Sequence, residues 1–255
     1  TSCDMNTDFV VLCLVLCCAP ALEAASKLPP FIKRCSRSDP KLNECALKSA
    51  QAVLPHLVKG DPKYKIMSID PARVDRMAFG DNSEKPVGMG FIMENCTITG
   101  LGSMAFTKTR FDLKKLHVEV EGIIRKLVIL GKYKVKGNIL ILPIKGEGNA
   151  NFTVDNVNFR NTMNYFLYKK KDGKDYFRTN DSKVNSTLGS VHVDLQNLFN
   201  GDKALGDNMN LILNENFREI ETIFRPVIEQ AIADLIAFVV NNILKDVPYD
   251  EIFLP

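Results

Sequence analysis

The sequence lacks the motifs that most enzymes and metal proteins carry. It contains no G-x-S-x-G nucleophile motif, no H-E-x-x-H zinc motif and no Walker phosphate loop. Its three histidines, His56, His117 and His192, are scattered, and no cluster of metal-ligand residues is evident. The segment 100–105, GLGSMA, lies among predicted strands without a βαβ unit and does not indicate a dinucleotide site. We therefore expect no catalysis, no metal and no cofactor.

A strong net charge is also missing. The 255 residues carry a formal net charge of +3, which becomes +6 without residues 1–24, because these contain three acidic residues and no basic one. So mild a basic balance does not indicate a nucleic-acid partner. The lysines at 169–171 are interpreted as a solvated hairpin tip. With 45% hydrophobic and 25% charged residues, the chain can build one large domain or two small ones.

The N-terminal segment has the pattern of a secretory signal peptide. Residues 9–22, FVVLCLVLCCAPAL, form a short apolar run that small residues follow, which places the cleavage after Ala24. Met5 is the expected start, although the residues before the run contain no lysine or arginine. An N-terminal anchor helix is the alternative, but the run is short and Pro20 interrupts it. We expect a secreted protein, with residues 25–255 as its single domain.

Few cysteines remain in the mature chain. Four of the seven lie in the leader or before it, which leaves Cys35, Cys45 and Cys96. Secretion favours disulfides, and Cys35 and Cys45 are close in sequence, so we predict a bond between them. Nothing near Cys96 would lower its pKa, and we expect a buried free thiol. Four N-x-S/T sequons fit a secreted glycoprotein, at Asn95, Asn151, Asn180 and Asn185.

A long apolar run near the C-terminus is the strongest positive signal. Thirteen of the twenty residues 225–244 are apolar. A membrane span needs about 20 mostly apolar residues with few charges, and Glu229 and Asp234 interrupt this run. We therefore expect no stable membrane insertion. A helix that is apolar on most sides is typical of a protein interior, so the rest of the chain must cover it.

The remaining sequence divides into a short helix and a long strand region. Asp39 and Pro40 fit the start of a helix over residues 39–57, with apolar residues at helical spacing. From about residue 64 to 195 the apolar period changes to two, and Asp172-Gly173 marks a hairpin turn. Successive strands with polar outer faces predict one long antiparallel sheet.

Helical periodicity returns for residues 210–245. One apolar row runs through Leu213, Phe217, Ile220, Phe224, Val227, Ile228, Ala231, Leu235, Phe238 and Val239. After Pro226 a second row runs through Ile232, Ile236, Val240 and Leu244. Pro226 is expected to kink this helix, because proline removes one backbone hydrogen bond. The predicted fold class is α+β, with a long bent C-terminal helix wrapped by a strongly curved antiparallel sheet. Incomplete packing between the two would leave an elongated apolar tunnel.

Four segments carry a resemblance to the insect takeout and juvenile-hormone-binding protein family. Residues 28–62, from LPPFIKRC to VKGDP, resemble its start, and IDPARVDRMAFG its segment entering the sheet. The stretch from NLFNGDKALGD to FRPVIEQ and the terminal VPYDEIFLP resemble its C-terminal signature. Two departures are Phe217, where the family often has tryptophan, and the lack of a partner for Cys96, which prevents the second disulfide of the hormone binders. The takeout-like branch therefore fits better.

This resemblance implies a secreted, circadian-related class of non-catalytic carrier with a hydrophobic tunnel, which we expect to act as a monomer. The ligand class would be a terpenoid such as a juvenile hormone, a fatty acid, a quinone or an odorant. We expect the tunnel to be lined by Val53, Leu57, Val118, Val120, Leu127, Ile129, Tyr133, Val135, Phe217, Phe224, Val227, Ala231, Leu235 and Phe238. A module that extracts lipid or docks on a membrane surface is the alternative, and an esterase ranks third because no nucleophile motif supports it.

Overall fold

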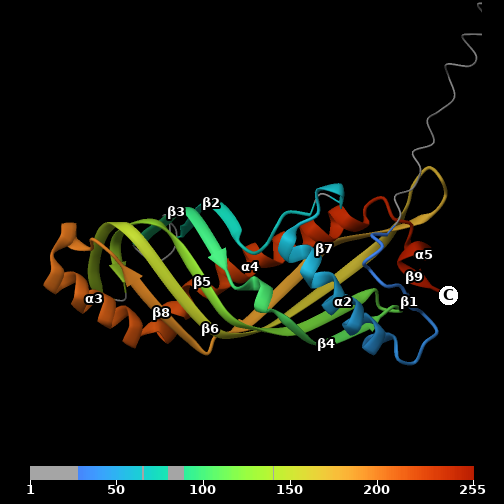
Figure 1. The fold of residues 1–255 in the computed structure, drawn as a ribbon, viewed down its shortest axis with the longest axis horizontal. Coiled ribbons are helices and arrows are strands. Elements are labelled where there is room, and N and C mark those ends of the chain that lie inside the picture. Colours follow the sequence, from blue (N-terminus) through green and yellow to red (C-terminus); the bar gives the residue numbers. More distant parts are fainter. Residues whose placement is uncertain (1–27, 65, 80–88, 140) are drawn as a thin grey trace, which may run out of the picture.

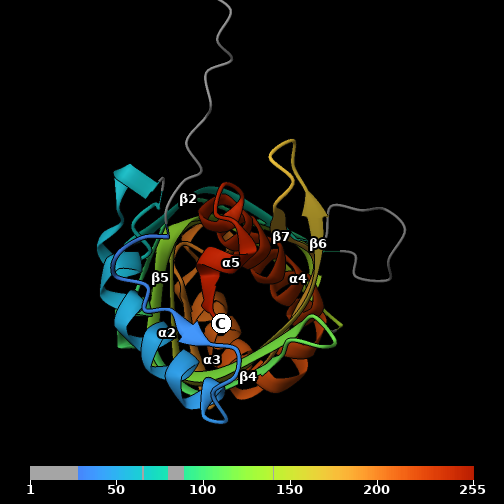
Figure 2. The ribbon, with the colours of Figure 1, turned by 90° about the vertical axis from the view of Figure 1, so that its right-hand side faces the viewer.

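The computed structural model describes residues 28–64, 66–79, 89–139 and 141–255. These residues form the expected α+β fold, in which a long antiparallel sheet is followed by a helical C-terminal region (Figure 1). The leader at residues 1–24 lies outside the described residues. A view along the length of the molecule shows the sheet curled around a central axis, with helix α4 (Phe217–Leu244) beside strand β7 (Asp175–Thr187) (Figure 2).

Two very long strands organise the sheet. Strand β5 (His117–Ile139) pairs along its length with β6 (Leu142–Lys169). The other edge of β5 pairs first with β4 (Ala105–Asp112) and then with β3 (Met89–Thr99), which pairs with β2 (Ala72–Phe79). The other edge of β6 pairs first with β8 (Ser190–Leu195) and then with β7. Strands β5 and β6 therefore run the length of the curled sheet, and different short strands pair with their two halves.

Halfway along the long strands, the residues that face inward switch between even and odd positions. On β6 the even-numbered Ala150 and Val154 are buried, whereas from Val157 onward the buried positions are odd-numbered. The change occurs at Asn156, whose φ is 54°. Asparagine tolerates this left-handed conformation better than most residues. Opposite it on β5, Arg125 and Lys126 are both exposed, so β5 changes parity at the same level.

The C-terminal helical region forms two helices instead of the single predicted one. Helix α3 (Lys203–Glu215) begins before residue 210, with Asp202 as its N-cap, and ends at Asn216, after which α4 starts. The Asn216 side chain donates to the Ile212 carbonyl at 2.8 Å, which satisfies the end of α3. Pro226 lies inside α4, which continues to Leu244. The expected single helix over 210–245 is therefore wrong in its start and in its continuity, while the kink expected at Pro226 stays a prediction.

The N-terminal helix also starts later than predicted. Helix α2 (Leu42–Lys59) begins three residues after Asp39, whose carboxylate accepts the N–H of Lys41 at 2.7 Å instead of capping the helix. Cys35 and Cys45 form the predicted disulfide, which joins α2 to strand β1 (Cys35–Ser36), and Cys96 is a buried free thiol as expected. The four sequon asparagines are all exposed.

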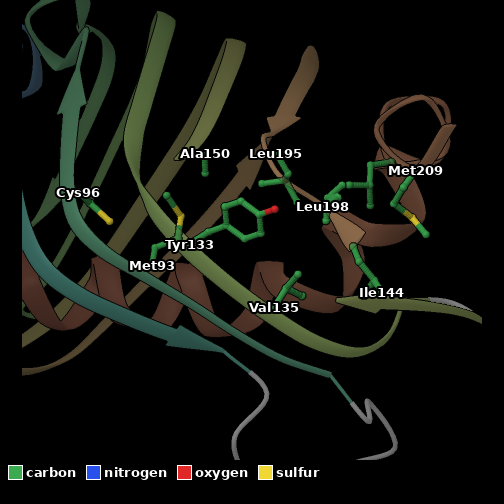
Figure 3. Close-up of a cluster of buried hydrophobic side chains, with 10 residues drawn as sticks. Met93, Cys96, Tyr133, Val135, Ile144, Ala150, Leu195, Leu198 and Met209 are labelled. Carbon is green, nitrogen blue, oxygen red and sulfur yellow. The ribbon is translucent and has the colours of Figure 1, made fainter. Parts of the chain in front are cut away.

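The core consists of separate clusters along the inner face of the sheet. The first cluster, shown in Figure 3, contains Met93, Tyr133, Leu198 and Leu213, among others, and packs against the N-terminal part of α4. The second cluster contains Met163, Tyr165 and Phe177, and packs against the C-terminal part of α4. A smaller third cluster surrounds Ile124, Val154 and Val157. The first two clusters thus occupy opposite ends of the same helix.

Short segments close one end of the molecule. Strand β9 (Phe253–Leu254) pairs in parallel with β1, and helix α5 (Tyr249–Ile252) precedes it. The C-terminus lies at this end, in line with the axis of the curled sheet (Figure 2). The structure also has three short 3₁₀ helices within the described residues, namely η1 (Pro62–Tyr64), η2 (Leu101–Ser103) and η3 (Phe199–Gly201), the last of which precedes α3.

Candidate functional site

The six strand residues predicted to face a tunnel lie on one face of the sheet. Directly paired residues of neighbouring strands share a face, and Val118 pairs with Met163, whereas Leu127 pairs with Val154. Tyr133 and Val135 are each 3% exposed and belong to the first cluster. Val118, Val120, Leu127 and Ile129 are only half-buried. These four side chains therefore retain accessible apolar surface on the inner face.

Tyr133 is anchored as a core residue. Its hydroxyl donates to the Gln196 carbonyl at 2.8 Å. Burial, with a smaller contribution from Asp194, raises the pKa of Tyr133 to about 12, so the hydroxyl stays neutral at physiological pH. Gly146 lies close enough that a Cβ there would meet the Tyr133 hydroxyl at 2.9 Å. The ring is thus enclosed by neighbouring chain segments.

A row of α4 residues spaced by four faces the same interior. Ile220 and Phe224 pack against the first cluster, and Ile236, Val240 and Leu244 pack against the second. A spacing of four advances about 40° around a helix at each step, which lets the row follow a twisted sheet. Ile228 and Ile232 occupy the two positions between these packed ends, and they are 41% and 43% exposed. Other side chains of the protein therefore leave the middle of this row uncovered.

The helix residues named from the sequence form the neighbouring row. Val227, Leu235 and Phe238 are 50%, 53% and 59% exposed, and Ala231 is exposed as well. Of the predicted helix residues, only Phe224 packs against a core cluster. The second row, which runs through Ile232 and Ile236, contributes no residue to the predicted site. The apolar periodicity fits both rows, so it does not indicate which of them packs against the clusters.

Three other predicted residues lie apart from this interior row. Val53 and Leu57 are half-buried on α2, which packs against β4 and η2. Phe217 is half-buried at the start of α4, with the Arg218 guanidinium 4.6 Å from the centre of its ring. The structure therefore brings Ile129, Tyr133 and Val135 together with Phe224 in the first cluster, whereas Val118 belongs to the second. Val53, Leu57 and Phe217 belong to neither cluster.

Asparagine side chains fasten the C-terminal helices to the sheet edges. Asn210 and Asn214 on α3 each bond both the N–H and the carbonyl of one β8 residue, Leu195 and Val193 respectively, at 2.7–3.0 Å. Asn241 on α4 does the same with Thr179 of β7, at 3.0 and 2.7 Å. Each amide thus bonds the backbone groups that a neighbouring strand would otherwise bond. We call these three contacts the asparagine clamps.

Two more contacts complete the covering of the edges. The Glu229 carboxylate accepts from the Ser186 N–H on β7 and from its hydroxyl, the latter at 2.8 Å. On β4, the side chains of Asn43 and Gln51 from α2 accept the N–H groups of Phe111 and Phe106, at 2.8 and 2.9 Å. Backbone groups that an edge strand would expose are therefore bonded by helix side chains.

A tyrosine pair holds the C-terminal segment at its end of the molecule. The hydroxyls of Tyr165 and Tyr249 are 2.8 Å apart, and both residues are buried in the second cluster. Burial is the main cause that raises the pKa of Tyr165 far above its usual value. The Arg37 guanidinium lies 4.9 Å from the centre of the Tyr249 ring. This end is therefore closed by buried, neutral aromatic side chains.

Two surface hollows lie away from the interior row. One, of about 510 Å³, is lined by Lys59, Gly60 and Ile66 among others, and the other, of about 330 Å³, is lined by Asp194, Gly206 and Asn210 among others. Neither contains any residue of the predicted site. Within the described residues, no group of three or more histidine, cysteine or carboxylate side chains could hold a metal ion.

Helix α4 is long and apolar enough, by length and composition, to cross a membrane. The interruption by Glu229 and Asp234 does not prevent this assignment on composition alone. In the structure, however, α4 is fastened to β7 through Glu229 and Asn241, and its interior row packs into two clusters of the protein. The helix is thus part of the protein fold here.

Comparisons with known proteins agree with this architecture. Residues 11–254 match the model of the haemolymph juvenile hormone binding protein family. The chain is 27% identical over 241 residues to the circadian clock-controlled protein daywake of Drosophila melanogaster, covering 91% of this chain and 90% of that protein. The daywake protein of Drosophila yakuba is 24% identical over 239 residues, with the same coverage.

A solved structure extends the similarity to three dimensions. The crystal structure of Takeout 1 from Epiphyas postvittana superposes with a TM-score of 0.77 and 28% identity, over 88% of this chain and all of that chain. The family model spans the curled sheet, the clamped helices and the C-terminal segment alike. The chain therefore belongs to the haemolymph juvenile hormone binding protein family and has a takeout-like fold.

Proposed function

We propose that this protein is a secreted, non-catalytic carrier that holds one small, elongated apolar ligand between the inner face of the sheet and α4. The ligand is of terpenoid, fatty acid, quinone or odorant class. The observation that carries the proposal is the accessible middle of the α4 row, where Ile228 and Ile232 lie between two packed clusters. An apolar row that is packed at both ends and open in the middle fits a lumen that a ligand fills.

The walls of this lumen follow from the residues that keep accessible surface. On the sheet they are Val118, Val120, Leu127 and Ile129, which are half-buried on the inner face. On the helix we place them at Phe224, Ile228, Ile232 and Ile236. Val227, Ala231, Leu235 and Phe238 form the bordering row, while Tyr133 and Val135 support the wall as packed core.

The affinity of such a carrier can be estimated from burial. A ligand that buries about ten methylene groups gains roughly 8 kcal/mol, at about 0.8 kcal/mol each. Lost translational and rotational freedom takes back several kcal/mol. We therefore expect dissociation constants of roughly micromolar order for an unfunctionalised chain.

One observation favours a second candidate function. The bordering row places three large apolar side chains, Val227, Leu235 and Phe238, at an exposure of 50% or more. An exposed apolar helix face can enter a lipid surface, as expected of a module that extracts lipid or docks on a membrane. This candidate requires the row to face solvent, whereas the carrier requires only the neighbouring Ile228 and Ile232 to face the lumen.

Saturable binding of a lipophilic fluorescent dye, followed by displacement with a terpenoid and with a fatty acid, tests the carrier. We expect Ile232→Trp to fill the lumen and weaken dye binding at least about tenfold, an effect of about 1.4 kcal/mol. Ala231→Trp, the adjacent residue on the bordering row, is the matched control and should bind dye like the wild type. Both variants are compared by thermal unfolding to confirm that they fold.

The two candidates give different outcomes. A wild-type protein that shows no saturable dye binding contradicts the carrier. If that protein instead floats with phosphatidylcholine vesicles, and Phe238→Glu abolishes the flotation, the membrane-surface module is supported. Dye binding that is lost in Ala231→Trp but kept in Ile232→Trp would move the helix wall to the bordering row.

A further inference from the structure

Two of the buried polar side chains on the inner face of the sheet, Asn161 and Ser182, bond to each other. Asn161 on β6 is 6% exposed and Ser182 on β7 is 8% exposed. Asn161 lies in the odd-numbered series of β6 that faces inward with Val157 and Met163, and Ser182 pairs directly with Met163. The adjacent Arg160 points the other way, because its guanidinium bonds Glu121 at 2.6 Å among exposed residues. Both polar groups therefore belong to the inner wall.

The hydrogen bonds of Asn161 fix the orientation of its amide. Its Nδ2 donates to the Ser182 hydroxyl oxygen at 2.9 Å and to the Lys183 carbonyl at 3.1 Å. A carbonyl can only accept, so the atom facing Lys183 must be the NH₂ group. The carbonyl oxygen of Asn161, Oδ1, consequently points away from these partners. It accepts no hydrogen bond from any side chain or backbone group that the structure describes.

This oxygen is not fully enclosed. Within the described residues, no fully enclosed side-chain nitrogen or oxygen lacks a hydrogen-bond partner. Because Asn161 Oδ1 has no partner, it must retain accessible surface, although its residue is more than nine-tenths buried. The Ser182 hydroxyl accepts from Asn161 and still has its own hydrogen to donate. The wall thus offers one free acceptor next to one free donor.

Apolar side chains flank this pair on the neighbouring strands. Val120 and Val184 pair with Asn161 from its two neighbouring strands, and Met163 lies opposite Ser182. Glu229, which lies on the helix beside β7, uses its carboxylate oxygen for the N–H and hydroxyl of Ser186. No cationic side chain bonds to either polar group among the described contacts. A carboxylate or phosphate would therefore lose its hydration without gaining a cation.

We propose that Asn161 and Ser182 form a polar subsite that binds a neutral hydroxyl group of an otherwise apolar ligand. The ligand hydroxyl donates to Asn161 Oδ1 and accepts from the Ser182 hydroxyl, which uses both free positions. An ester, ketone or ether can only accept, which leaves Oδ1 unpaired beside it. The inference rests on the proposed carrier function and narrows its ligand to a long-chain or terpenoid alcohol.

Displacement of the lipophilic dye by two ligands of equal size tests the subsite. 1-Dodecanol and 1-methoxyundecane have the same number of heavy atoms, but only the alcohol can donate. We expect the wild type to prefer the alcohol by about 3- to 10-fold, the range that one net neutral hydrogen bond supports. Asn161→Leu should remove this preference while the affinity for the ether stays the same or rises.

Two further variants keep the test decisive. Asn158→Leu changes an exposed asparagine on the same strand and should retain the preference. If Asn161→Leu does not fold, Ser182→Ala, which is smaller by one oxygen, should also reduce the preference. Equal displacement by alcohol and ether in the wild type overturns the subsite while the carrier stands. An absence of saturable dye binding contradicts the carrier itself, and the displacement arm then does not apply.

Discussion

At the scale of single residues, the disulfide joins strand β1 to helix α2, which are parts of different ends and edges of the fold. Cys35 belongs to β1, which pairs with the C-terminal strand β9, and Cys45 belongs to α2, which covers the β4 edge. A bond of this kind stabilises mainly by restricting the unfolded chain. Here it also holds the N-terminal helix against the closed end of the molecule.

Removing this bond should lower the free energy of unfolding without changing the fold. For Cys45→Ser we expect a loss of about 2–5 kcal/mol, the usual range for a native disulfide. Chemical denaturation of both proteins measures the difference, with Cys96→Ser as the control that leaves the bond intact. Peptide mapping without reduction should find Cys35 joined to Cys45. A bond from Cys96 to either of them would contradict the assignment.

Residue chemistry was partly readable from the sequence. The disulfide was predicted from the expected secretion and from the spacing of Cys35 and Cys45, and the buried Cys96 thiol from the lack of groups near it that would lower its pKa; both are confirmed. The free oxygen of Asn161 was not predictable, because it depends on which face of β6 turns inward. That face changes at Asn156, and a change of one residue in parity reverses every side chain beyond it.

At the scale of elements, the asparagine clamps explain why α3 and α4 stay on the sheet. An apolar row alone can slide along an apolar surface, whereas each clamp fixes one helix residue to one strand residue through two hydrogen bonds. Asn241, for example, positions the C-terminal half of α4 relative to Thr179. The clamps therefore set the register in which the accessible Ile228 and Ile232 are presented.

Asn241→Ala should destabilise the protein measurably. It removes two hydrogen bonds and leaves the Thr179 N–H and carbonyl without their partner, which we expect to cost about 1–3 kcal/mol. Asn242→Ala, one residue further on, removes no described hydrogen bond and should change stability by less than about 0.5 kcal/mol. Urea denaturation of both variants gives the comparison. Equal losses would show that the clamp contributes nothing specific.

The existence and order of the elements could be predicted, but their ends could not. Periods of two and of 3.6 identified the strand region and the C-terminal helices. The sequence predicts one continuous helix with a kink at Pro226, whereas the structure divides this region at Asn216, whose side chain satisfies the end of α3. Which of two adjacent apolar rows faces inward was equally hidden, since it depends on how the helix crosses the twisted sheet.

At the scale of the whole molecule, the fold class followed from one requirement, namely that a largely apolar helix needs cover. The curled sheet meets that requirement only in part, because Ala233 is the one residue of α4 that is fully buried. The sequence could not show this openness. Whether a lumen stays unfilled depends on distances between strands and helix that no periodicity encodes.

We predict that the protein is secreted as a monomer and carries its ligand through purification. We expect native mass spectrometry of protein from its natural source to show one chain that begins at or near Ala25, plus a small apolar adduct. Extraction and mass analysis of that adduct identify the ligand, and an alcohol would agree with the polar subsite. An intact apolar run at residues 9–22 on a membrane-bound product would instead support an anchor.

The long pairing of β5 with β6 has a consequence for how the chain folds. These strands are neighbours in sequence, so their contacts close short loops and cost little chain entropy, while β3, β4, β7 and β8 all add to their outer edges. We expect this hairpin to be the nucleus, formed in the transition state before the helices dock. Destabilising substitutions within it should slow refolding, whereas those in the asparagine clamps should mainly speed unfolding.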